Sequence, residues 1–322
     1  MSNVISRLLA TSAFLCACAA SAQQYPTKAI SLIVPFAPGA SADGIARLVG
    51  RELSQSLGQP VVVENKPGAG GALGLMALAK AAPDGYTIGM GATGAIVINP
   101  HLPDAPPLKP ERDLVALAKV ADIPLVFVTS SASGYGDLKS FLAAAKAKQG
   151  GLSYGTAGQY TSQHLSGELL ASMSKSPLSP IPYKGSSPAV TDLLGNTLPA
   201  AMVDLTSAYQ HVKAGKLVAL GVTSPNRSKV APEIPTIAEA GVPGYSSPAW
   251  MGMFLPVGVP EDVKAKLSAA LQAVMAKPQV QTQIGSLSAE PTYLDSAGFS
   301  KLIQDESSKW AAVISRIPAP AK

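Results

Sequence analysis

The chain has little cysteine, few aromatic residues and no cluster of positive charge, and each scarcity excludes a class of function. Its 2 cysteines, Cys16 and Cys18, both lie within the first 22 residues. The rest of the chain therefore has no thiol for a disulfide bond or a cysteine-bound metal. Aromatic residues make up 5%, and the net charge of +5 comes from scattered lysines and arginines. Nucleic-acid binding requires a basic stripe with stacking aromatics, so we expect no nucleic-acid partner.

Histidine is equally scarce. The three histidines, His101, His164 and His211, are isolated from one another, and no His-Glu-x-x-His or Cys-x-x-Cys spacing occurs. We therefore predict no metal site and no bound cofactor. A nucleophile elbow is also missing, because Asp43 stands where Gly-x-Ser-x-Gly around Ser41 would need its second glycine.

One glycine motif suggests a nucleotide and is rejected on its context. Residues 89–94, GMGATG, match Gly-x-Gly-x-x-Gly after a predicted strand. A dinucleotide site needs this motif to open a helix on the first strand–helix turn. Here the match follows the third predicted strand, and the prolines between 100 and 110 prevent a long helix. A phosphate-binding loop is also excluded, because Leu217 follows Gly215-Lys216 where serine or threonine is needed.

Residues 1–22 resemble a secretion signal. Arg7 precedes an apolar run over 8–19, and Ala20-Ser21-Ala22 supplies small residues for cleavage. The run is shorter than the roughly 20 apolar residues that span a bilayer, so we predict export to the periplasm. Lipid attachment at Cys18 is the alternative, but Cys16 would be unusual within a lipidation box.

Strand-like and helix-like segments alternate through the rest of the chain, which predicts an α/β fold with mixed, mostly parallel sheets. The predicted strands are 29–34, 60–64, 86–90, 115–120, 125–129, 152–154, 199–203, 217–223 and 248–255, and the predicted helices are 45–57, 72–81, 136–148, 164–173, 187–195, 261–276 and 297–314.

The chain is long enough for two domains. Residues 122–124 read as a crossing into a second domain, and the strand at 248–255 reads as a return. We therefore predict a discontinuous first domain, 23–122 plus 246–322, and a second domain, 123–245, with a cleft between two lobes. We expect a monomer.

The loop at 35–44, PFAPGASADG, joins a predicted buried strand to an amphipathic helix. It has glycine and alanine but no cationic side chain. Such a loop presents backbone amides at the positive end of a helix, which suits a carboxylate. A plain corner without a ligand would use the same residues.

Three further segments would meet this loop at the carboxyl ends of the strands. They are 91–94 with Thr93, 155–164, and 183–187, and Asp204 ends a strand beside them. Each has a structural alternative: Phe36 as core, His164 bonded to backbone, Lys184 solvated, Ser187 as a helix cap, and Asp204 as the cap of the next helix.

At these corners the chain resembles the extracytoplasmic solute receptors of the tripartite tricarboxylate transporter system, called the Bug family in bordetellae. The resemblance covers residues 25–317. It is carried by PFAPG (35–39), VENKPGAGG (63–71), APDGYT (82–87), PYKG (182–185), VTDLLG (190–195) and PTIAEAG (235–241).

The resemblance implies a type II periplasmic-binding-protein fold, whose two lobes close on a small carboxylate through a hinge. It also implies the site: Phe36, Ala37, Gly39, Ala40, Ser41, Asp43, Thr93, Thr156, Ala157, Gly158, Tyr160, Thr161, Gln163, His164, Gly185, Ser186 and Asp204. Tyr160 and Gln163 depart from the family pattern, so they would reshape the pocket. Tyr160 would make it more apolar or stack on an aromatic acid.

We therefore expect a periplasmic receptor that binds a small organic anion, a dicarboxylate, tricarboxylate or aromatic acid, without transforming it. The resemblance implies delivery to the small and large membrane subunits of a secondary transporter. A sensor reporting to a membrane kinase remains an alternative. A secreted hydrolase using Ser41 with His164 or His101 is a weaker one, because the nucleophile elbow is missing.

Overall fold

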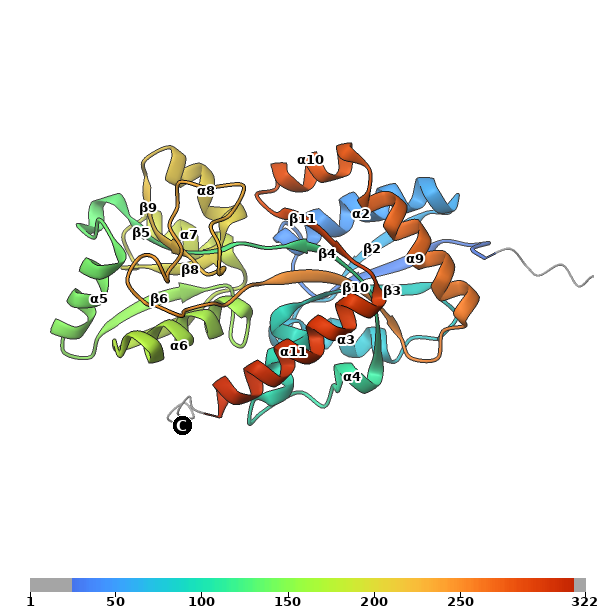
Figure 1. Cartoon of the computed structure of the whole chain (residues 1–322), viewed down its shortest axis with the longest axis horizontal. Helices are drawn as coiled ribbons and strands as arrows, with labels where there is room; N and C mark the ends of the chain where they lie inside the picture. Colours follow the sequence, from blue (N-terminus) through green and yellow to red (C-terminus); the bar gives the residue numbers. More distant parts are fainter. Residues whose placement is uncertain (1–24, 316–322) are drawn as a thin grey trace, which may run out of the picture.

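The structure is a computed structural model that describes residues 25–315. The predicted secretion signal, with Cys16 and Cys18, lies outside the described residues. The chain forms two α/β lobes side by side, joined by long strands that run between them (Figure 1). The predicted fold class is confirmed.

The first lobe is built on a six-stranded sheet of order β11-β4-β10-β3-β1-β2. Strand β1 pairs in parallel with β2 and β3, whereas β10 is antiparallel to β3 and β4, and β11 is antiparallel to β4. Its strands are β1 (Ile30–Val34), β2 (Val61–Asn65), β3 (Thr87–Ala92), β4 (Leu114–Asp122), β10 (Trp250–Pro256) and β11 (Glu290–Leu294).

The second lobe is built on a five-stranded sheet of order β7-β6-β8-β5-β9. Strand β6 is parallel to β7 and β8, and β5 is antiparallel to β8 and β9. Its strands are β5 (Leu125–Ser130), β6 (Leu152–Thr156), β7 (Leu178–Pro182), β8 (Ala201–Asp204) and β9 (Leu217–Val222).

Antiparallel pairing is more extensive than the expected mostly parallel sheets. The reason lies in the crossings. A strand that arrives from the other lobe enters its new sheet at the edge facing the cleft. The parallel strands of that sheet end at this edge, so the entering strand is antiparallel to them. Strand β5 enters the second sheet in this way, and β10 enters the first.

The helices pack on both sheets (Figure 1). They are α2 (Ser41–Leu57), α3 (Ala72–Ala79), α4 (Pro110–Asp113), α5 (Leu138–Ala147), α6 (Ser162–Ser174), α7 (Ser186–Leu194), α8 (Leu205–Lys213), α9 (Glu261–Met275), α10 (Pro278–Ser286) and α11 (Ser296–Ile314). Helix α2 buries Ile45, Leu48, Val49 and Leu53 and ends, as the sequence predicts, at Gly58, whose φ of 70° is left-handed.

Several elements differ from the sequence predictions. Helix α7 begins at Ser186 with Gly185 as its N-cap, so the predicted capping by Ser187 is wrong. A π-helix, η2 (Gly94–Ile98), follows β3, and α4, β7, α10 and β11 have no counterpart among the predicted elements. The five residues of η2 are all buried, so tertiary packing rather than local pattern holds them in this form.

Two connections join the lobes. Strand β4 continues through Ile123-Pro124 into β5, and the chain after β9 returns as β10. The amide of Ile123 donates to the carbonyl of Ala249 at 2.8 Å, which ties the outgoing and returning segments together. Every residue of β10 is buried. Within residues 25–315, no helix has the length and hydrophobicity to cross a bilayer, and no histidine, cysteine or acidic side chains gather as a metal site.

Candidate functional site

The first corner of the candidate site joins β1 to α2. Ala40 occupies the N-cap position of α2 with extended backbone, and no side chain caps the helix there. The first amides of a helix have no acceptor within it. The start of α2, from Ser41 onwards, therefore keeps hydrogen-bond donors for something outside the helix.

Asp43 fixes the shape of this loop. Its buried carboxylate accepts hydrogen bonds from the Gly39 amide at 3.0 Å, from Asn65 Nδ2 at 2.9 Å and from Arg47 Nε at 3.0 Å. Burial by itself raises the pKa of Asp43, but the hydrogen bonds from Arg47, Gly39 and Asn65 and the charge of Arg47 bring the pKa below its usual value. Asp43 is thus an ionised support of the loop. With these partners, it has little capacity left to contact a ligand.

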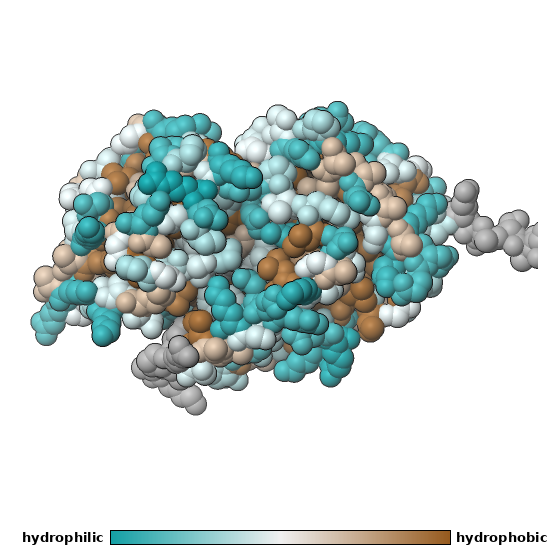
Figure 2. Space-filling view, viewed as in Figure 1, coloured by the Kyte–Doolittle hydropathy of each residue, from teal (hydrophilic) through white to brown (hydrophobic). Residues whose placement is uncertain are grey.

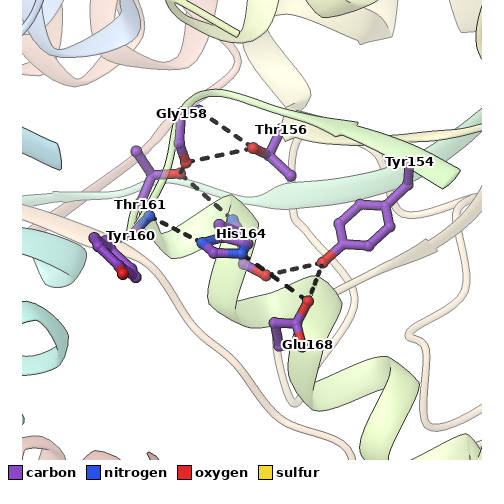
Figure 3. A network of polar contacts seen from close by, with 7 residues as sticks. All are labelled: Tyr154, Thr156, Gly158, Tyr160, Thr161, His164 and Glu168. Atoms are coloured by element: carbon purple, nitrogen blue, oxygen red, sulfur yellow. Dashed lines mark hydrogen bonds and ion pairs between the residues drawn. The ribbon is translucent and has the colours of Figure 1, made fainter. Parts of the chain in front are cut away.

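The second corner joins β6 to α6 in the other lobe (Figure 3). Thr161 is the N-cap of α6: its hydroxyl donates to the Gly158 carbonyl at 2.8 Å and accepts the His164 amide at 3.4 Å. The hydroxyl of Thr156 receives the Gly158 amide at 3.3 Å. These bonds stay within the loop, so the two threonines shape it rather than point free donors outwards.

His164 is held within this corner. Its Nδ1 accepts the Tyr160 amide at 2.9 Å, and its Nε2 lies 4.0 Å from the Glu168 carboxylate (Figure 3). Burial lowers the pKa of His164 to about 4. A nitrogen that accepts an amide hydrogen carries no proton of its own, so the geometry and the lowered pKa both describe a neutral imidazole. The backbone-bonded alternative describes His164 in this structure.

We expect an NMR titration to show the His164 imidazole titrating near pH 4 instead of the usual 6.5. A pKa lower in the folded than in the unfolded chain means that stability is lost as pH falls from 6.5 towards 4. The variant His164→Asn should lose this signal and flatten that part of the stability profile. A midpoint near 6.5 would show that the imidazole is exposed.

The two lobes touch at two glycines. A methyl group built on Gly94, at the start of η2, would lie 2.9 Å from the backbone nitrogen of Ser162 in α6. One built on Gly70 would lie 3.3 Å from the carbonyl oxygen of Tyr160. The lobes are thus closed on each other, and Figure 2 shows the notch that remains between them at the upper edge of that view.

Asp204 bridges the lobes. The Ser41 hydroxyl of the first lobe and the Gln163 side-chain amide of the second both donate to its carboxylate, and its own amide donates to the Ser186 hydroxyl at 3.2 Å. Burial raises the pKa of Asp204 against the effect of these two side-chain bonds. Although Asp204 is the N-cap of α8, its side chain makes no capping bond, so the capping alternative fails.

The structure brings some predicted residues together and separates others. Ser41, Gln163, Ser186 and Asp204 form one linked cluster. Thr93 is fully buried and outside this cluster: its hydroxyl accepts the Trp250 amide at 2.8 Å and so holds β10 in place.

The remaining predicted residues are backbone or lining positions. The Gly185 amide donates to the Ala157 carbonyl at 3.0 Å, which joins two loops of the second lobe. The Ala40 amide donates to the Ala37 carbonyl at 3.2 Å. Phe36 is half-buried, and its ring faces Gly71.

Sequence reasoning missed the glycines at the contact between the lobes. Gly70 belongs to the cluster at 68–71, which was interpreted as the segment before a helix and as part of the family resemblance, and Gly94 was placed in a ligand loop. For Gly94 a signal existed, because a glycine within an apolar segment can mark a close approach of another chain segment. Which segment approaches it is not written in the local sequence.

Residues 45–318 match the family described as "Tripartite tricarboxylate transporter family receptor". The chain is also 35% identical over 303 residues to the protein BugT of Bordetella pertussis, covering 94% of this chain and 93% of BugT.

Several solved structures are similar to this chain in both sequence and fold. The periplasmic binding protein BugD is 32% identical with a TM-score of 0.83, covering 91% of this chain and 98% of BugD. MatC of Rhodopseudomonas palustris with bound malate has 30% identity and a TM-score of 0.83, with 90% and 100% covered. A second R. palustris protein, solved with adipate, has 28% identity and a TM-score of 0.84, with 90% and 97% covered.

Proposed function

Because the chain belongs to the tripartite tricarboxylate transporter receptor family, we propose that it closes its two lobes on a small organic carboxylate and delivers it to a tripartite tricarboxylate-type transporter. Its relatives are binding receptors, not enzymes. We further propose the division into 23–122 plus 246–322 and 123–245, with residues 1–22 as an export signal.

One observation carries the ligand proposal: the uncapped start of α2 lies beside a cluster of neutral donors from both lobes. Ser41 comes from the first lobe, Gln163 and Ser186 come from the second, and Asp204 links them. A carboxylate between the lobes would meet the free amides at the start of α2 and would compete with Asp204 for the side-chain donors, without a fixed cation. A ligand that contacts both lobes favours the closed form, because only that form makes both sets of contacts.

The bound neighbours support the acid class. MatC holds malate and the other R. palustris protein holds adipate, so a dicarboxylate of four to six carbons is the first class to test here. Tricarboxylates and aromatic acids remain in the proposal because Tyr160 departs from the family pattern.

A thermal-shift screen across dicarboxylates, tricarboxylates, aromatic acids and amino acids tests the proposal. An acid present at a hundredfold its dissociation constant should stabilise the fold by about 2.7 kcal/mol. Mass spectrometry of the recovered acid should show it unchanged. If no acid shifts the melting temperature, or if the acid is consumed, the receptor proposal is wrong.

An uptake experiment in living cells distinguishes a role in transport from a role in sensing. A deletion strain should lose uptake of the identified acid if the protein serves a transporter. Normal uptake with a lost transcriptional response would instead favour the sensor alternative.

A further inference from the structure

The carboxylate of Asp204 is buried among neutral partners. Its two oxygens receive the Ser41 hydroxyl from α2 and the Gln163 amide from α6. The adjacent Ser186 hydroxyl at the start of α7 is bonded to the Asp204 backbone amide. A buried carboxylate is normally paired with a cation, so this one is unusual.

None of the ion pairs formed by residues 25–315 includes Asp204. The charged groups on α2 and α6 face other partners. On α2, Arg47 pairs with Asp43 at 3.0 Å. On α6, the neutral His164 faces the Tyr160 amide and Glu168. Lys184, before α7, is exposed. Among the described residues, Asp204 therefore has no paired cation, and its side-chain partners at the cleft, Ser41 and Gln163, are neutral.

A bound acid would add a second negative charge beside Asp204. Two carboxylates that share a site repel each other. Either one of them takes up a proton, or the protein binds the acid more weakly. An ammonium or hydroxyl group on the carbon next to the ligand carboxylate would donate a hydrogen bond to Asp204. The contact between the ligand and Asp204 would then be attractive instead of repulsive.

Ser41 strengthens the argument. Its hydroxyl has one hydrogen, which Asp204 accepts in this structure. A donor on the ligand would replace Ser41 at Asp204, and the released hydroxyl could then donate to the ligand carboxylate. A ligand without such a donor must either leave Asp204 poorly partnered or forgo the Ser41 bond, and both cost affinity.

We propose that Asp204 is the specificity-determining residue of the cleft, and that it selects acids with a hydrogen-bond donor on the carbon beside a carboxylate over unsubstituted acids of the same length. This inference rests on the proposed function and narrows its ligand class to amino and hydroxy acids.

Two matched series of acids test the selection by calorimetry on the full-length mature protein. Succinate, malate and aspartate share four carbons, and glutarate, 2-hydroxyglutarate and glutamate share five. In each series the middle acid adds a hydroxyl and the last an ammonium. In the series that fits the cleft, we expect the amino acid to bind tightest and the unsubstituted acid weakest, with roughly tenfold or more between them, as hydrogen bonds to charged groups provide.

The variant Asp204→Asn removes the charge with little change of shape. We expect it to reduce the preference to about threefold or less, by weakening the amino acid and strengthening the unsubstituted acid. The matched control Ser41→Ala removes a donor of the same contact and keeps the charge. It should weaken most the acids that carry a donor, because only these release the Ser41 hydroxyl to their carboxylate, while the order within each series stays the same.

The outcomes separate the two proposals. Equal binding within both series, or an unchanged preference in a folded Asp204→Asn protein, would overturn donor selection while leaving the receptor proposal intact. If none of the six acids binds but another acid in the wider screen does, donor selection by these groups also fails. If no acid binds at all, the receptor proposal itself fails.

Discussion

Replacing Gly94 with alanine should weaken ligand binding by roughly 5- to 150-fold, the equivalent of about 1–3 kcal/mol of overpacking. The added methyl would lie 2.9 Å from the Ser162 backbone nitrogen, and its nearest atoms all belong to Thr161 and Ser162 of the other lobe. The φ of Gly94 is not in the left-handed region, so alanine suits the local backbone. The cost therefore falls on closure of the lobes.

Calorimetry with the strongest acid from the thermal-shift screen measures the affinity, and small-angle scattering measures opening through the radius of gyration. The control is Gly136→Ala, which also avoids the left-handed region and meets no atom within 4 Å. It should bind as the wild type does. Wild-type affinity and dimensions in the Gly94→Ala protein would mean that the bound form does not bring η2 onto α6.

Replacing Asp43 with alanine should destabilise the protein by about 3 kcal/mol, because the Gly39 amide and the Asn65 side chain lose a charged acceptor. The loop before α2 would then lose the bonds that fix it. We expect acid binding to become too weak to measure by calorimetry. Thermal unfolding measures the stability, and a shift of several degrees corresponds to this loss.

The variant Asp43→Asn is the matched control, since it keeps an oxygen acceptor and removes the charge. Its loss should be smaller. Because the folded pKa of Asp43 lies below its usual value, the charge stabilises the fold above the unfolded pKa, and this is lost as pH falls through the folded pKa. The stability gap between wild type and Asp43→Asn should thus be constant from pH 5 to 7 and shrink below about pH 4. A constant gap below pH 4 would contradict this role.

The Gly94 and Asp43 variants test two different requirements of the same cleft. Gly94 controls how closely the lobes approach, whereas Asp43 controls the loop that presents the start of α2. The effects of the Gly94 and Asp43 variants should be the same for every acid, whereas the effect of Asp204→Asn should depend on the acid. The three variants together therefore distinguish a protein that cannot close its lobes from one that closes but does not select its ligand.

Local rules predicted much of the fold. The apolar spacing of α2 and its stop at Gly58 were both visible in the sequence, as was the crossing at Ile123-Pro124. The missed strand β11 lacked such a signal. Strand β11 is a half-buried edge strand with an irregular register against β4, so it shows no clear alternation. Helix α7 starts one residue before the predicted cap because Gly185, with a φ of 119°, turns the chain into it.

The sequence by itself determined the order of strands and helices, the glycine-rich corners and the family resemblance, because these depend on neighbours along the chain. Only the tertiary structure decided which corner residues meet. Ser41 and Asp204 are 163 residues apart in sequence, and Gly94 meets Ser162 across the lobes. Contacts of this kind depend on how the two lobes are placed relative to each other. No local pattern of side chains along the chain encodes that placement.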